Sequence, residues 1–531
     1  MKITLKLTLL FFSFLMSNVL LSQEEVYIES ENIPDTYIGE FNKDYLFYSK
    51  KKTLIKNKEA KILKKEGDNF VEKFNYVCLE DERIIDVFTE KGSLYILSDI
   101  KDGKNLNFTI KELDVNFHTV FTKVLFSMNS LVKNKLSLTV KHEDNALGII
   151  CVKKMTTNEG FVSLINLENK EVANYKIEVD GLEYYTVSDI VFNSNLESSI
   201  IIEGFKHEFS GIISEEKSKV FVIKCSNQKS NILKVKSFYE DVFCKSYKFC
   251  KIDDESYLIG SMVYKKERSE LMEGYSLANE SFGLSELNET KIIYNKELNT
   301  NPKYWMPKDF EQIQKNKFLS NSSEQRLVKI VMNYNDVVFV SESQYKSLSG
   351  AGTSHTIGSN ATSTTGGITG GFTYTEKNEY DFIFEDIIFT KINIKNYEIE
   401  WTNKTINRFD DKKYVFYYDN NSLTFNYFWN ENNFILLFDV AVRNLDISGV
   451  FSPKDIGVIM PSDMKTTAGY LINDDISPKL LSNNYIDLPL VKYNVHTLYL
   501  NENNKYSIMI YESKKPALQA EIKKYRMLEF K

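Results

Sequence analysis

The stretch from Ile84 to Phe126 constrains the fold of this chain more than any other part of the sequence. It contains four short runs rich in β-branched and aromatic residues, separated by turn-forming sequences at Glu90–Gly92, Lys101–Gly103 and Asp114–Asn116. Such a pattern predicts an antiparallel meander of four strands. The run Leu94–Leu97 is apolar on both alternating faces, which predicts a strand that is covered on both sides. A meander of this kind, repeated along a chain, is typical of a β-propeller blade.

Comparable units recur along the sequence. Their first strands start near residues 84, 136, 187 and 247, a spacing of about 50 to 60 residues that fits the longer blade types. We therefore expect an all-β fold. We expect this fold to be a single closed β-propeller over residues 26–531 with about seven four-stranded blades. Six or eight blades are the alternatives. Propellers usually close by pairing strands from both chain ends, so a last strand is expected near Lys524–Phe530.

Composition supports strands and excludes one class of partner. Aromatic residues make up 13% of the 531 residues, which favours strands over helices. The net charge is −7, and lysines alternate with acidic residues without forming a basic block. A nucleic-acid partner is therefore not expected.

The segment Met1–Ser22 has the features of a secretory signal peptide. Lys2 and Lys6 precede the apolar run Leu7–Leu21, and the small Ser22 follows it. We expect cleavage near Ser22 and export to the periplasm or the extracellular space. An uncleaved N-terminal anchor is the alternative. No later segment is long and apolar enough to span a membrane as a helix, so no membrane span is expected after cleavage.

Two segments interrupt the strand pattern. Asn301–Leu319 has the charge distribution of a short helix between blades, with acidic residues early and lysines late. Ser347–Gly371 is nearly all Ser, Gly, Thr and Ala, which predicts a flexible loop. Strand-like runs at Val337–Val340 and Asp386–Ile392 flank it, so the loop should join two strands of one blade.

One phrase resembles a known group of proteins. Ile387–Asn393, followed by Ile399–Trp401, is similar to a strand phrase of poorly characterised exported bacterial β-propeller-like proteins. Asn396 and Tyr397 stand where that phrase usually has a glycine turn. The resemblance implies the propeller fold and an exported location, and it carries no catalytic residue.

The cysteines and histidines do not form a recognisable metal site or nucleophile arrangement. Cys244 and Cys250 would lie about 20 Å apart on one strand, too far for a disulfide. No close cysteine pair suits zinc, so buried thiols in strands are expected. His142 is expected in an exposed turn with Glu143 and Asp144, and His355 in the flexible loop. The full sets are Cys78, Cys151, Cys225, Cys244 and Cys250, and His118, His142, His207, His355 and His496.

Pairs of adjacent acidic residues are the main candidates for catalysis. They are Asp81–Glu82, Asp253–Asp254, Asp410–Asp411 and Asp474–Asp475. Glycan-cleaving enzymes use two carboxylates, and the separation of the two decides the chemistry. Neighbouring residues of a strand point to opposite faces, and each pair has a turn-like context, so hairpin tips are the favoured interpretation.

Two hypotheses about function follow. The first is an exported, non-catalytic propeller that binds a protein or a glycan in the cell envelope. The second is a propeller-type glycan hydrolase or lyase that uses paired carboxylates. The lack of a catalytic motif favours the first. No catalytic residue is assigned, and neither a cofactor nor a metal site is expected.

Overall fold

The structure is a computed structural model, and the residues it describes are nearly all in strands and tight turns. The signal segment Met1–Ser22 and the expected helix Asn301–Leu319 lie outside the described residues, as do Asp474 and Asp475. The described residues are 24–28, 34–50, 59–66, 69–129, 136–143, 145–153, 159–182, 184–210, 213–239, 241–265, 272–295, 323–333, 335–348, 354–356, 373–375, 379–405, 410–415, 425–430, 433–441, 465–472, 479–480, 490–500, 506–513 and 522–530.

The strands form consecutive antiparallel sheets, each built mainly from neighbouring strands of the sequence. The first sheet holds β2 (Thr36–Phe41), β3 (Asp44–Lys50), β4 (Glu59–Glu66) and β5 (Asn69–Val77). The second holds β6 (Glu82–Glu90), β7 (Ser93–Asp102), β8 (Asn105–Leu113) and β9 (Thr119–Asn129). The third holds β10 (Leu136–Glu143), β11 (Ala146–Lys153), β12 (Glu159–Asn166) and β13 (Val172–Glu178). The fourth holds β14 (Tyr184–Phe192), β15 (Ser198–Ser210), β16 (Ile213–Ser226) and β17 (Lys229–Lys234).

The second half of the chain continues the series. The fifth sheet holds β18 (Phe238–Tyr239), β19 (Val242–Lys251), β20 (Ser256–Tyr264), β21 (Met272–Ser281) and β22 (Lys291–Tyr294). The sixth holds β23 (Ser323–Asn333), β24 (Asp336–Leu348), β27 (Glu379–Asn393), β28 (Glu398–Thr405) and β29 (Asp410–Val415), with a ribbon of β25 (Ser354–Thr356) and β26 (Thr373–Thr375) between β24 and β27. The seventh holds β30 (Phe425–Asn430), β31 (Asn433–Ala441), β32 (Lys465–Ile472) and β33 (Lys479–Leu480). The eighth holds β34 (Leu490–Leu500), β35 (Tyr506–Ser513), β36 (Ile522–Phe530) and β1 (Glu24–Ile28).

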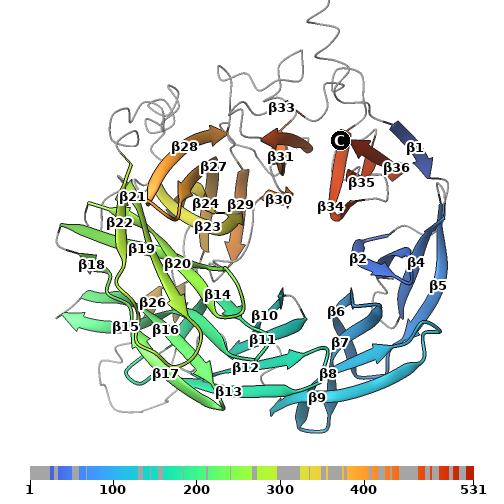
Figure 1. Ribbon diagram of the computed structural model, residues 1–531, viewed down its shortest axis with the longest axis horizontal. Coiled ribbons are helices and arrows are strands. Elements are labelled where there is room, and N and C mark those ends of the chain that lie inside the picture. The colour runs from blue at the N-terminus through green and yellow to red at the C-terminus, as the bar shows by residue number, and fades with distance from the viewer. Residues whose placement is uncertain are drawn as a thin grey trace, which may run out of the picture.

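These sheets are arranged as the blades of a β-propeller (Figure 1). The all-β propeller fold is therefore confirmed, with eight sheets of four or five strands among the described residues. Eight is one of the two alternatives to the expected seven. The difference arises because β2–β5 form a separate blade before the meander at Ile84–Phe126, which is the first of the repeats expected from the sequence. Strand β1 pairs with β36 in the eighth sheet, so the two ends of the chain meet in one blade, as expected.

The second sheet shows why the sequence forms this meander. Its four strands begin and end where the turn signals predicted. Lys91 and Gly92 have φ angles of 45° and 77°, the left-handed geometry of a two-residue hairpin turn that matches the twist of the strands. Leu94, Ile96 and Leu97 are fully buried, which confirms that β7 is covered on both sides.

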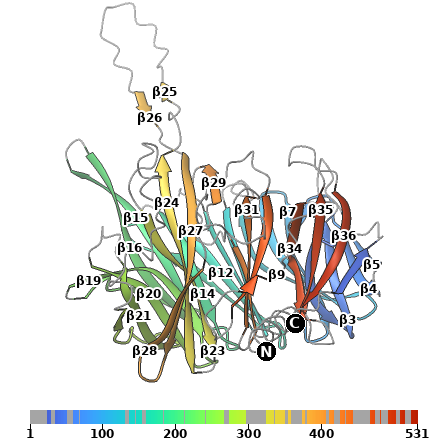
Figure 2. The same ribbon diagram turned by 90° about the horizontal axis from the view of Figure 1, so that it is seen from above.

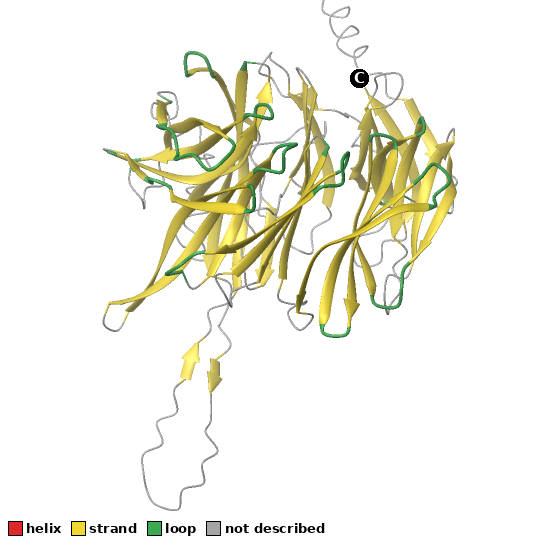
Figure 3. Cartoon of the chain, turned by 60° about the horizontal axis from the view of Figure 1, so that its bottom comes forward, coloured by secondary structure: helices red, strands yellow, loops and turns green. Residues whose placement is uncertain are grey.

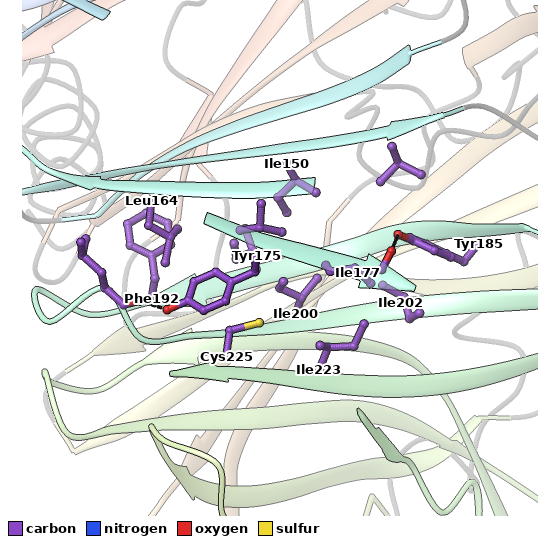
Figure 4. Close-up of a cluster of buried hydrophobic side chains, with 14 of the residues drawn as sticks. Ile150, Leu164, Tyr175, Ile177, Tyr185, Phe192, Ile200, Ile202, Ile223 and Cys225 are labelled. Atoms are coloured by element: carbon purple, nitrogen blue, oxygen red, sulfur yellow. Dashed lines mark hydrogen bonds between the residues drawn. The ribbon is translucent and has the colours of Figure 1, made fainter. Parts of the chain in front are cut away.

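The hydrophobic core is divided among the junctions between neighbouring sheets. Figure 4 shows the cluster between the third and fourth sheets, where Leu164 and Tyr175 face Phe192, Ile200 and Cys225. Similar clusters lie at the junctions from the first sheet to the sixth. All five cysteines are buried, as expected. Among the described residues, no helix has the length and apolar character needed to cross a membrane.

Candidate functional site

In most blades, a strand on the inner side of the ring (Figure 1) carries a local irregularity. The pairing of β2, β6, β14, β19 and β23 with the next strand shifts register near the middle of each strand. Such a bulge leaves backbone groups without a partner in the ladder and bends the strand. Buried backbone groups need a partner, so these inner strands need polar side chains from their neighbours.

The junction between β14 and β19 shows how this need is met. Asp189 follows the bulge of β14, and one carboxylate oxygen accepts a hydrogen bond from its neighbour Ile190 N at 2.8 Å. The other oxygen accepts one from Phe249 N of β19, also at 2.8 Å. In return, Lys248 Nζ donates to Ser188 O at 2.6 Å. These hydrogen bonds connect β14 to β19 next to their bulges.

Asp86 occupies the equivalent place in β6. One of its oxygens accepts a hydrogen bond from Val87 N, and the other lies 2.8 Å from Nε2 of His142 on β10. The His142 ring also packs edge-on against Phe88, with ring centroids 4.2 Å apart. Asp86 and His142 keep 36% and 39% of their side-chain surface exposed, which makes them the more accessible part of this arrangement.

Lys141 links β10 to β14. Its ammonium group lies 2.6 Å from Glu143 and 3.7 Å from Asp189, and it donates to Ile190 O. Burial alone would lower the pKa of Lys141, but the nearby carboxylates of Asp189 and Glu143 outweigh it and raise the pKa. The lysine therefore stays charged and forms ion pairs with both carboxylates.

We call Asp86, Lys141, His142, Asp189 and Lys248 the inner belt. Each member makes a hydrogen bond or ion pair that connects two inner strands. Both oxygens of Asp86 and of Asp189 are occupied by protein donors or by His142. This arrangement connects neighbouring blades.

A second feature is the unequal length of the hairpins. Strands β15 and β16 have 13 and 14 residues, whereas β11 and β12 have 8 each. The inner strand β14 pairs with β15 only as far as Phe205, so the part from Lys206 to Lys217 is a two-stranded ribbon. The hairpin gains five residues in β15 and six in β16, which extend it by about 16 to 20 Å.

The sixth sheet is extended in the same way. Strands β24 and β27 have 13 and 15 residues. The C-terminal part of β27 pairs with β28, whereas its N-terminal part, Glu379–Phe384, pairs with β29. The ribbon of β25 and β26 continues beyond it. Figures 2 and 3 show that both extensions leave the ring on the same face. We call this the projecting face.

Among the described residues, the candidate acidic pairs lie in or beside three different sheets. Asp253 and Asp254 lie in the turn between β19 and β20, as a hairpin tip. Glu82 is buried and accepts hydrogen bonds from Tyr76, Ser98 and Lys111. Asp410 and Asp411 begin β29, so the expectation of a turn was wrong for that pair.

The pKa of three of these residues is lowered, whereas a general acid needs a raised pKa. Burial would raise the pKa of Glu82, but hydrogen bonds led by that of Lys111 lower it. The Glu255 amide and then Ser256 lower the pKa of Asp253. Lys251 and Ser194 lower that of Asp254.

The histidine expectations were partly wrong. His142 lies in β10, paired with Leu147, and not in a turn. His355 lies in β25. The sequence does contain a signal for the inner belt: one polar residue interrupts an apolar strand at Ile84–Val87, and two polar residues do so at Val187–Ile190. No group of histidine, cysteine and acidic residues among the described residues could hold a metal ion.

No family model matches the chain, and no curated protein matches it. Among solved structures, it is similar to an oligogalacturonate lyase in complex with manganese, with 8% identity and a TM-score of 0.33 over 85% of this chain and 96% of that one. It is also similar to a post-proline cleaving enzyme from Rickettsia typhi, with 10% identity and a TM-score of 0.32 over 91% of this chain and 58% of that one. A third is the β-propeller domain of the Trilobed protease from Pyrococcus furiosus, with 10% identity and a TM-score of 0.28 over 71% and 97%. At these values, the similarities say nothing about the activity of this chain.

Proposed function

We propose that the chain is an exported, non-catalytic β-propeller that binds a protein or glycan partner in the cell envelope. The observation that supports the proposal best is the projecting face, where the hairpins of the fourth and sixth sheets extend beyond the ring. A two-stranded ribbon is at best marginally stable in water. An extension of this kind adds little to the core of its blade, and it offers loops and strand edges to a partner.

The inner belt supports the same proposal over the glycan-cleaving alternative. A hydrolase or lyase needs carboxylates that face the substrate, one of them with a raised pKa. Asp86 and Asp189 are bound to neighbouring strands, and the pKa values of Glu82, Asp253 and Asp254 are lowered. These carboxylates suit a structural role.

Shortening the hairpin tests the role of the projecting face. Gly204 and Lys219 are paired across β15 and β16, so an Asn-Gly turn can replace the residues between them. The matched control is Gln228→Gly. It creates an Asn-Gly turn with Asn227 at the other end of β16, where both residues already have positive φ. We expect the shortened variant to bind isolated cell envelopes at least 10-fold more weakly than the wild type, and the control to bind normally. Equal binding by all three, with equal thermal midpoints, would remove the projecting face from the proposal.

Export is a separate part of the proposal, and it rests on the signal-like segment Met1–Ser22. N-terminal sequencing of the protein from its native host should show a mature chain that starts close to residue 23. An intact Met1 on protein found in the cytosol would contradict export.

A further inference from the structure

A pocket lies between the fourth and fifth sheets, and none of its lining residues belongs to the projecting hairpins. Its volume is about 410 Å³, within the range of about 300 to 1,000 Å³ that is usual for small-molecule sites. The floor is apolar and is built from β17, β19, β20 and β21. Its side chains are Leu233, Val235, Tyr247, Ile259 and Ala278.

One wall of the pocket is the segment that joins β21 to β22, and a buried ion pair holds it. Lys224 Nζ lies 3.0 Å from Glu280 Oε2, and the two side chains are 0% and 1% exposed. Lys224 also donates to Ser285 Oγ at 3.0 Å and to Ser281 O at 3.3 Å. The other oxygen of Glu280 accepts a hydrogen bond from Asn288 N at 2.7 Å. The ion pair therefore fixes both ends of the wall.

Burying two charges has a large desolvation cost, so such a pair is weak evidence for added stability. Here its effect is geometric, because it sets the position of the wall before any ligand arrives. Asn231 Nδ2 of β17 adds a hydrogen bond to Leu284 O at 3.1 Å. A pocket that is already in its final shape loses less entropy when it binds a ligand.

The rim decides the chemistry of the ligand. Tyr239, Asn288 and Thr290 line the pocket, and the hydroxyl of Tyr239 donates a hydrogen bond to that of Thr290 at 2.9 Å. Apart from Glu280, whose charge is paired with that of Lys224, the charged residues that line the pocket are two cations and two anions: Lys234, Lys236, Glu286 and Glu289. A balanced rim does not select a charged ligand. Hydroxyls beside an apolar floor with a tyrosine suit a ring that has one apolar face and a hydroxylated edge.

We infer that this pocket binds a single neutral sugar residue. The apolar face of the sugar would lie on the floor near Tyr247 and Ala278, and its hydroxyls would exchange hydrogen bonds with Tyr239, Thr290 and Asn288. The inference does not depend on the projecting face, since the pocket and the hairpins are separate parts of the chain.

The test is saturation-transfer NMR on the full chain with glucose, galactose, mannose and N-acetylglucosamine, and with galacturonic acid as the charged comparison. We expect at least one neutral sugar to bind with a Kd near 1 mM, or about −4 kcal/mol, and galacturonic acid to bind at least 10-fold more weakly. The methyl glycoside of the best sugar shows whether the ligand is a free sugar or the end of a glycan.

Two variants locate the binding. Ala278→Phe fills the pocket and should weaken binding at least 10-fold, whereas Val120→Phe, at an exposed position of β9, should leave it unchanged. Tyr239→Phe keeps the ring and removes one hydroxyl, so it should weaken binding several-fold. If no neutral sugar binds, or if the sugar binds Ala278→Phe and the wild type equally, the inference is wrong.

Discussion

Replacing Lys224 with methionine should have a large effect that is concentrated near the pocket. The substitution keeps most of the apolar volume but removes the cation that faces Glu280 at 3.0 Å. Glu280 then stays buried without this cation, and it keeps the hydrogen bond from the backbone amide of Asn288. Breaking a buried pair in this way costs about 3–5 kcal/mol. Ser285 also loses a hydrogen bond, so we expect the loss of stability to lie in the upper part of that range.

Hydrogen exchange measures this change locally. A chain with eight blades need not unfold in one step, so a global unfolding free energy is a poor measure. Amide exchange in residues 281–290 should become at least 100-fold faster in Lys224→Met, because about 3 kcal/mol corresponds to two factors of ten. Exchange in the second sheet should not change.

The double variant Lys224→Met, Glu280→Leu provides the control. It removes both charges and leaves one unpaired amide, that of Asn288, so it should recover more than half of the loss. If Lys224→Met leaves exchange in this segment unchanged, or if the double variant is worse than the sum of both single variants, the ion pair does not hold the wall.

Three further predictions concern the rest of the molecule. A Cβ on Gly39 would lie 1.8 Å from Thr89 Oγ1, and Gly39 has a φ of +124°. Gly39→Ala should therefore lower the free energy of unfolding by about 2–4 kcal/mol, as measured with urea. Adding Thr89→Ala should restore only the part of this loss that comes from the steric clash. The pKa of Glu82 is lowered in the folded protein. Its contribution to stability is therefore complete above the unfolded pKa of about 4.3, and it is lost as the pH falls through the pKa of the folded protein. Between about pH 5 and pH 3, Glu82→Gln should therefore lose less thermal stability than the wild type. Burial, and then Asp99, raise the pKa of Cys151 to about 12, so Cys151 should resist a thiol reagent at pH 8 until the protein is unfolded.

The sequence was sufficient for the fold because its strand signals are local. Alternating apolar residues and turn residues gave the position of the meander at Ile84–Phe126, and the spacing gave the repeats. Pairing between the chain ends could be expected because a propeller has to close. The sequence pattern missed the blade β2–β5, because lysines interrupt the apolar runs between Lys50 and Lys65.

The inner belt and the pocket could not be predicted, because they depend on contacts between blades. Asp86 and His142 are 56 residues apart, and Lys224 and Glu280 are also 56 apart. No local pattern says which inner strands are neighbours. A bulge also changes which face a residue occupies, so simple alternation would misplace a polar residue that follows it, such as Asp189.

The most direct test of the central claim is product release from a panel of polysaccharides. The claim is that the carboxylates of the inner belt join blades and do not cleave glycans. The purified protein should release no new reducing ends and no unsaturated products, whether or not it binds the polysaccharide. Cleavage that is present in the wild type and lost in a folded Asp86→Asn or Asp189→Asn variant would show that the protein is an enzyme, and it would contradict the account.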